Sequence, residues 1–263
     1  MKRGYNLATI KPLMGDTTPS STAYANGDWL FGWTAFEIPT GACFIRTINM
    51  LVAGTNGASG NTHDIQFYYA RSINGVAPTN LAVENVGPTD IGATVSKNNI
   101  IGYSHLDLSA TDDSDHLTAY NIIGSRTAAG ADNTQNSGST HNVILQGDPK
   151  YPSAAGYQTI WLGAIARGAF DFGTAVVLNM AESADVAADK TGTSVALTTS
   201  GTDPRKCFQP GDQLIGSTTT VTMEVVSVDS ATAMTVKNVS AQIDHGEELI
   251  LRSPIKIYMG LEY

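Results

Sequence analysis

The stretch Asp28–Ile38, DWLFGWTAFEI, decides the fold class of this chain. It places four apolar residues at alternate positions: Trp29, Phe31, Trp33 and Ala35. Side chains two residues apart point to the same side of a β-strand, so this spacing predicts a strand with those four residues on one face. The segment Pro39-Thr40-Gly41 follows at once and predicts a turn.

Short runs of the same kind continue along the chain, each bounded by glycine, proline or polar clusters. They are CFIRTINMLVA (43–53), DIQFYYA (64–70), NNIIGYSHLDLS (98–109), HLTAYNIIG (116–124), HNVILQG (141–147), YQTIWLGAIA (157–166) and TAVVLNM (174–180). The Asn-Gly pairs at 56–57 and 74–75 predict tight turns, because these residues reach positive φ at little cost. This spacing predicts an all-β fold, an antiparallel β-sandwich of the jelly-roll type.

The composition agrees with sheets rather than long helices. Charged residues make up 15% of the 263 residues, against about a quarter in an average globular protein, and 26 glycines are spread along the chain. An exposed helix usually covers its outer face with Lys, Glu and Arg, and no window of this sequence has that character.

A second, smaller unit is expected near the C-terminus. After the polar linker 182–203, the run VTMEV (221–225) alternates and then slips in phase at Val226, as a β-bulge would produce. With strands expected around 213–215, 234–236 and 246–251, this segment predicts a small β-barrel.

The expected division of the chain is therefore threefold. An extended N-terminal arm covers 1–27, a β-sandwich main domain covers 28–181 and 253–263, and a small β-barrel insertion covers 182–252. The closing strand IKIYM (255–259) is expected to rejoin the sandwich beside 174–180, because an insertion costs little when its ends lie close together.

Charge and hydropathy exclude several classes of partner. The net charge is −9 and the basic opening Lys2-Arg3 is only two residues long, so nucleic acid is not an expected partner. No apolar segment has the length of a signal peptide core or of a membrane span, and the run 159–166 is too short. We expect a protein that is made in a cytoplasm and does not associate with a membrane.

No motif for catalysis, a cofactor or a metal is visible, and we expect no enzyme activity. The histidines lack HExxH or HxH spacing: His63, His105, His116, His141 and His245. There is no GxSxG or GxxxxGK[ST] motif. Cys43 and Cys207 fall in different expected domains, which predicts free thiols rather than a disulfide.

Three features of the sequence each allow two interpretations. The acidic segment Asp107–Asp115 could bind calcium, although it lacks the EF-hand pattern and a solvated turn explains it as well. The polar segment 124–140 predicts an exposed loop, either mobile or in contact with partner subunits. Several aromatic residues could stack on sugars or pack in the core: Trp29, Trp33, Phe67, Tyr68, Tyr69, Trp161, Phe170 and Phe172.

Four passages spread over most of the chain resemble virion structural proteins of marine tailed phages, including cyanophages, of the capsid decoration (cement) type. They are FYYARSINGVAP (67–78), KNNIIGYSHLDLS (97–109), VILQGDPKYPSAAGYQTIWLGAIARGAFDF (143–172) and KCFQPGDQL (206–214). The resemblance lies in phrase and texture, without a diagnostic chemical motif, and it carries no catalytic or cofactor residues onto this chain.

The resemblance implies a non-enzymatic protein on the exterior of the virion capsid. Such a protein binds the major capsid protein through many shallow contacts and self-associates as a homo-oligomer, commonly a trimer. The major capsid protein itself is disfavoured, because its usual fold needs a long spine helix. The alternatives are a tail tube or tail fibre component, a carbohydrate-binding or receptor-binding virion protein and, more distantly, a glycan-active enzyme.

Overall fold

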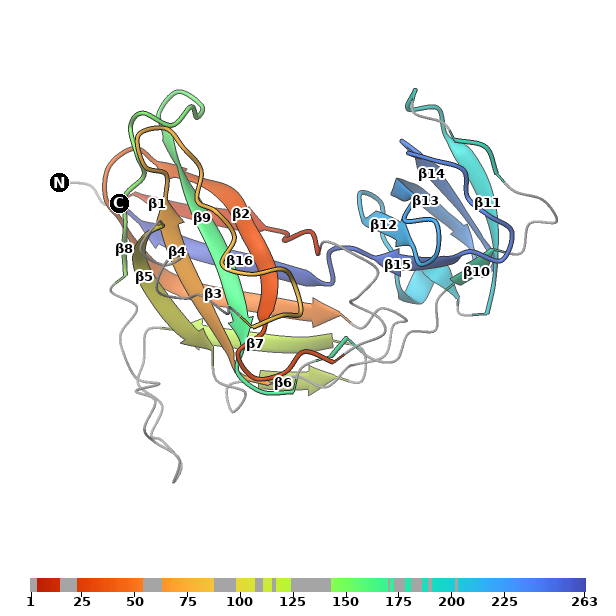
Figure 1. Cartoon of the computed structure of the whole chain (residues 1–263), viewed down its shortest axis with the longest axis horizontal. Helices are drawn as coiled ribbons and strands as arrows, with labels where there is room; N and C mark the ends of the chain where they lie inside the picture. Colours follow the sequence, from red (N-terminus) through yellow and green to blue (C-terminus); the bar gives the residue numbers. More distant parts are fainter. Residues whose placement is uncertain are drawn as a thin grey trace.

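The computed structural model describes residues 4–14, 23–53, 63–87, 98–106, 111–114, 117–123, 143–169, 171–172, 178–180, 186–188, 191–201 and 203–263, with the backbone alone described at 111–114, 117–123 and 178–180. Within these residues the regular structure is β, apart from one 3₁₀ turn at Pro204–Lys206. Figure 1 shows two β units, with β15 in the smaller unit and β16 in the larger one.

The larger unit is a sandwich of two antiparallel sheets. The first sheet has the order β1 (Tyr5–Ile10), β16 (Ile255–Glu262), β3 (Cys43–Ala53), β7 (Leu117–Ile123) and β6 (Thr111–Ser114), and β8 (Ile144–Leu145) pairs with β3. The second sheet has the order β2 (Trp29–Pro39), β9 (Tyr157–Ala166), β4 (Ile65–Arg71) and β5 (Asn99–Leu106). All of these pairs are antiparallel, as the short alternating runs predict.

The order of the strands is that of a jelly roll. Apart from the short strands β6 and β8, each strand of the sandwich lies in the other sheet from the strand before it, except that β4 and β5 are neighbours within the second sheet. The neighbours β1–β16–β3–β7 and β2–β9–β4–β5 are therefore mostly distant in sequence, the arrangement of two Greek keys. The prediction of an all-β, antiparallel, jelly-roll-like sandwich is confirmed.

The sandwich core lies between the sheets and follows the period of two. On β16 the inward residues are Ile255, Ile257, Met259 and Leu261, all of them buried. On β3 the buried positions change phase between Ile45 and Ile48, where a bulge opposes Gly260 and Leu261. Burying one such side chain contributes roughly 1.5–3 kcal/mol, so these rows supply most of the energy that holds the sheets together.

Strand β2 departs from the expected single face. The pairing of β2 with β9 shifts in register between Trp29 and Phe31 and again between Phe31 and Thr34. The side chains of β2 therefore do not simply alternate between the two faces of the sheet. Phe31 enters the main core, whereas Trp29 and Trp33 pack together on the outer side of the sheet with ring centroids 5.4 Å apart, and Ala35 is exposed. The Trp29 ring lies over Gly163 of β9, where an added Cβ would be 2.4 Å from it.

The smaller unit is a closed barrel with the order β10 (Leu178–Met180), β11 (Val195–Ser200), β14 (Ala233–Lys237), β13 (Thr222–Ser230), β12 (Gln213–Gly216) and β15 (Glu248–Leu251). Its core is separate from that of the sandwich and includes Leu197, Met223, Met234 and Val236. The predicted bulge is present, because the register of β13 shifts between Val225 and Ser227.

Three expectations about the boundaries of the two units are corrected. The expected N-terminal arm is not free over its whole length: Tyr5–Ile10 forms β1, because YNLATI alternates and buries Ala8 and Ile10. The closing strand β16 pairs with β1 and β3 instead of 174–180. Residues 178–180 belong to the barrel, so its strands start before the expected boundary at 182.

Hydrogen bonds tie the barrel to the sandwich where the chain returns from it. The Arg252 N–H donates to the Gln213 carbonyl, and the Arg252 carbonyl accepts from the Met14 N–H. Lys256 Nζ lies 3.9 Å from Oδ1 of the buried Asp212. Burial lowers the pKa of Lys256, and the nearby Asp212 carboxylate opposes that shift.

Candidate functional site

The outer face of the first sheet carries exposed aromatic and apolar side chains. Cross-strand register sets Tyr5 opposite Glu262, Glu262 opposite Phe44 and Phe44 opposite Ile144. Tyr5 is 70% exposed, Leu7 60% and Ile144 50%. Directly opposite residues lie about 4.5–5.5 Å apart at Cβ, so this row forms one continuous strip across four strands. We call the outward residues of these strands the β1–β8 face: Tyr5, Leu7, Thr9, Phe44, Arg46, Asn49, Ile144, Tyr258 and Glu262.

The β1–β8 face is nearly free of acidic charge, in a chain whose net charge is −9. Strands β1, β16, β3 and β8 contain one acidic residue, Glu262, and two basic residues, Arg46 and Lys256. Arg46 Nε donates to Glu262 Oε2, and the guanidinium lies over the Phe44 ring, 5.3 Å from its centroid. Aromatic residues and arginine with few unpaired charges are typical of the central part of a protein interface.

One position of this face carries no side chain. Gly260 of β16 faces outward beside Thr47, and a Cβ at Gly260 would lie 2.4 Å from Thr47 Oγ1. Gly260 lies opposite Leu7 as well as Thr47, so the middle of the Leu7 row has no side chain. Its absence leaves a surface on which another protein can lie closely.

The outer face of the second sheet is largely covered by the chain itself. The connection from β4 to β5 packs Leu81 and Ala82 against Trp29, Trp33 and Tyr68. The Trp33 backbone N–H donates to the Asn80 side chain, and its indole N–H donates to the Thr79 carbonyl over 2.8 Å. Tyr103, which is 64% exposed, lies opposite Tyr68 at the uncovered part of this face.

The aromatic residues that could stack on sugars are therefore mostly structural. Phe67, Tyr69 and Phe172 are fully buried in the sandwich core. Trp161 packs edge-on against Tyr151 with centroids 5.6 Å apart. Phe170 lies outside the described residues. Tyr68, next to the exposed Tyr103, remains a candidate for stacking.

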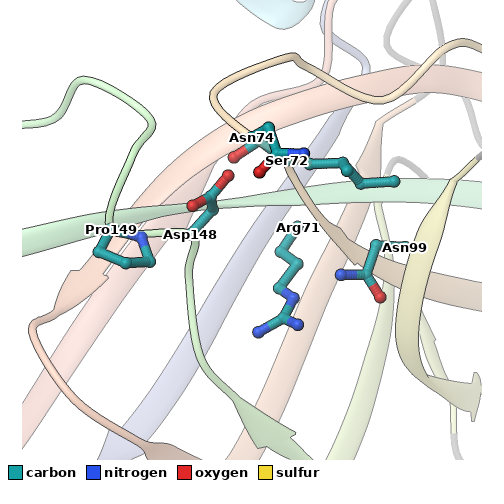
Figure 2. Close-up of a pocket in the computed structure, with 7 residues that line it drawn as sticks. Arg71, Ser72, Asn74, Asn99, Asp148 and Pro149 are labelled. Atoms are coloured by element: carbon teal, nitrogen blue, oxygen red, sulfur yellow. The ribbon is translucent and has the colours of Figure 1, made fainter.

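A polar cavity of about 240 Å³ lies where β4, β5 and the segment before β9 meet (Figure 2). Asp148 accepts hydrogen bonds from the Gly75 and Lys150 backbone N–H groups, each over 2.9 Å. These bonds, led by the one from Gly75, lower the pKa of Asp148. They hold the predicted Asn74-Gly75 turn, in which both residues have positive φ.

The charged residues of this cavity already have partners. Figure 2 shows Arg71 extending toward Asn99 rather than toward Asp148. With the amide turned so that its oxygen faces the guanidinium, Arg71 donates to Asn99 over 3.2 Å. Arg71, Asn99 and Asp148 had no signal in the sequence, because their separation along the chain gives no recognisable spacing. Their contacts join the loops at this end of the sandwich.

Two of the five histidines, His63 and His105, each contact Asp64. His105 Nε2 lies 3.1 Å from Asp64 Oδ2, and the Asp64 N–H donates to His63 Nδ1 over 2.9 Å. His245 is exposed on the barrel, and His116 and His141 lie outside the described residues. Among the residues with described positions, no three His, Cys, Asp or Glu side chains gather as a metal would require.

The segment considered for calcium is only partly described. Asp107 and Asp115 lie outside the described residues, as does the predicted loop 124–140. Asp112 and Asp113 belong to strand β6, so the expectation of a turn over the whole segment is wrong at these two positions. Cys43 in the sandwich and Cys207 in the barrel are both free thiols.

Comparison with known proteins gives no assignment: no family model, no curated protein and no solved structure matches this chain. In the part of the chain with described positions, no helix has the length and apolar character needed to cross a membrane. The β1–β8 face as a whole has no signal in the sequence, and only the alternation of YNLATI indicates its edge strand.

Proposed function

We propose that this protein is a non-enzymatic virion structural protein that binds and stabilises a phage capsid from the outside, as a decoration protein. The observation that carries the proposal is the β1–β8 face, which exposes Tyr5, Leu7 and Ile144 and is nearly free of acidic charge. The resemblance of the chain to phage decoration proteins supplies the partner, the major capsid protein.

The properties of the face suit this role. A decoration protein needs a rigid platform, and the two sheets hold Phe44, Tyr258 and Ile144 on strands rather than on loops. The remaining surface bears most of the acidic residues and repels DNA and other acidic molecules. Many copies on a repeating shell would add weak single contacts into stable attachment.

Binding to expanded capsids tests the proposal. Purified protein is mixed with capsids that lack decoration, and occupancy is measured by co-sedimentation and by imaging of the particles. Regular occupancy of shell positions supports the proposal. Assembly of the protein into tubes, without capsid binding, would favour the tail tube or tail fibre alternative instead.

Matched variants locate the contact. Ile144→Glu places a charge on the β1–β8 face at a residue that is 50% exposed, whereas Tyr103→Glu places the same charge on the other sheet at a residue that is 64% exposed. We expect Ile144→Glu to weaken capsid binding by at least about tenfold, the scale of an interface hot spot. Tyr103→Glu should bind like the wild type, and equal loss in both variants would contradict the assignment of the face.

A second candidate function has one observation in its favour. Tyr103 and Tyr68 lie side by side at the uncovered part of the second sheet, where a sugar ring could stack on them. Glycan-array binding that disappears in Tyr103→Ala, with capsid binding absent, would support a carbohydrate-binding or receptor-binding virion protein.

A further inference from the structure

Strand β1 has a free edge whose hydrogen-bonding groups can be identified. Gly4 and Tyr263 exchange two backbone hydrogen bonds, of 2.9 and 3.0 Å. Antiparallel pairing alternates, so Asn6, Ala8 and Ile10 direct their N–H and C=O groups toward β16. Tyr5, Leu7 and Thr9 therefore direct theirs away from the sheet. In the described part of the chain, β1 is the end of its sheet.

The side chains leave this edge open. Tyr5 is 70% exposed, Leu7 is 60% exposed and Thr9 is also exposed, so none of the described residues covers these side chains. The strand YNLATI contains no charged residue, no proline and no bulge against β16. Proteins usually block an edge strand with such devices, and an edge without them is a template for pairing with another strand.

We propose that β1 pairs antiparallel with β1 of a second copy of this chain, across a two-fold axis at Leu7. Each outward residue then contributes one N–H and one C=O, which gives about six hydrogen bonds across the axis. The first sheets of the two copies become one continuous sheet, with the β1–β8 faces of both copies on the same side.

The register follows from the strand itself. With the axis at Leu7, Leu7 lies opposite Leu7 of the second copy, and Tyr5 lies opposite Thr9. All three outward positions are then paired. Tyr5 is aromatic and Thr9 is β-branched, and such a pair is favourable when the two residues lie opposite each other on neighbouring strands. A shift of two residues in either direction leaves one of the three unpaired. A two-fold contact also gives a closed dimer, and two-fold symmetry is the commonest symmetry of homo-oligomers.

The distribution of charge allows a second copy to approach this edge. Two chains of net charge −9 repel, so they approach best where acidic residues are few. Strands β1 and β16 together hold one acidic residue, Glu262, which is bound by Arg46. The inference does not depend on the proposed function, and it yields a dimer rather than the trimer that the resemblance implies.

Light scattering after size exclusion gives the first test. We expect a mass of twice 27.7 kDa for the wild type. Leu7→Pro removes only an N–H that β16 does not use, and proline is tolerated on an edge strand at such a position. We expect Leu7→Pro and Leu7→Lys to have the mass of one chain, whereas Leu7→Val keeps the dimer. Far-UV circular dichroism checks that each variant is folded.

Cross-linking tests the register. Opposed hydrogen-bonded residues have Cα atoms about 5.5 Å apart, which lies within the disulfide range. In a Cys207→Ser background, Leu7→Cys should form a covalent dimer on mild oxidation, and the equally exposed Tyr103→Cys should not. A wild-type monomer or trimer, a dimer that survives both Leu7→Pro and Leu7→Lys, or equal cross-linking by the two cysteines would overturn the inference. Capsid binding is measured separately, so failure here leaves the proposed function to its own test.

Discussion

Replacing Gly163 by alanine should destabilise the sandwich by about 2 kcal/mol, the cost of overpacking a tightly filled site. An added Cβ would lie 2.4 and 2.7 Å from two atoms of the Trp29 ring and 3.1 Å from Trp33. Trp29 is fully buried, so its ring has no open space into which to move. The strain is relieved only if β2 and β9 separate slightly, which weakens the packing of both strands.

Urea unfolding followed by tryptophan fluorescence measures this effect in the sandwich alone. All three tryptophans, Trp29, Trp33 and Trp161, belong to β2 and β9, and the barrel contains none. With a slope of about 2 kcal/mol per molar urea, the midpoint should fall by about 1 M. Gly87→Ala is the matched control, because the nearest atom to its added Cβ is 3.6 Å away. That variant should unfold at the wild-type midpoint or slightly above it.

A double-mutant cycle identifies the cause. Trp29→Phe removes the ring atoms that lie over Gly163 and should by itself cost about 1–2 kcal/mol, because it leaves a cavity. Gly163→Ala added to Trp29→Phe should then cost about 1 kcal/mol less than in the wild type. A midpoint for Gly163→Ala equal to that of Gly87→Ala, or strict additivity in the cycle, would refute the reasoning.

Three further predictions concern charged and thiol groups. The pKa of Asp148 lies below its ordinary 3.8 in the folded protein. The stabilising effect of its carboxylate is therefore complete above pH 3.8 and is lost as the pH falls through the folded pKa. Asp148→Asn should flatten this acid dependence and cost roughly 1–3 kcal/mol at neutral pH, as read from denaturant midpoints. Asp212→Ala leaves Lys256 without its partner and should lower the thermal midpoint, whereas the pair Asp212→Leu with Lys256→Met should be less harmful than Asp212→Ala alone. Burial raises the pKa of Cys207 to about 11, so alkylation of this thiol by iodoacetamide at pH 8 should be slow until the barrel unfolds. Mass spectrometry measures the labelling, and rapid labelling of the native protein would show that the thiol is accessible.

The sequence predicted the strands well because alternation and turn residues are local signals. The run CFIRTINMLVA is β3 from end to end, and the phase slip at Val226 is a bulge in β13. Strand β2 could not be read in the same way, because its two register shifts depend on how Trp29 and Trp33 pack against β9. Bulges of this kind have no signature when the residues on both faces are apolar.

Long-range pairing was harder to predict than the strands themselves. The N-terminal strand Tyr5–Ile10 lies beside β16, which is more than two hundred positions away in the sequence, and no local pattern specifies that partner. The β1–β8 face is assembled from four such strands. Its residues become neighbours only through the jelly-roll order, so single-sequence reasoning could list them but could not join them.

The hydrogen-bonded pair of Gly4 and Tyr263 makes the chain suited to circular permutation. Figure 1 shows both ends at the side of the sandwich remote from the barrel. A short glycine-rich linker from 263 to 4 would close the ring, and new ends could be opened in the β13–β14 hairpin at Ser230–Ala233. A cargo fused at those new ends would be displayed on the barrel, whereas a tag beside residue 4 or residue 263 would lie on the sandwich.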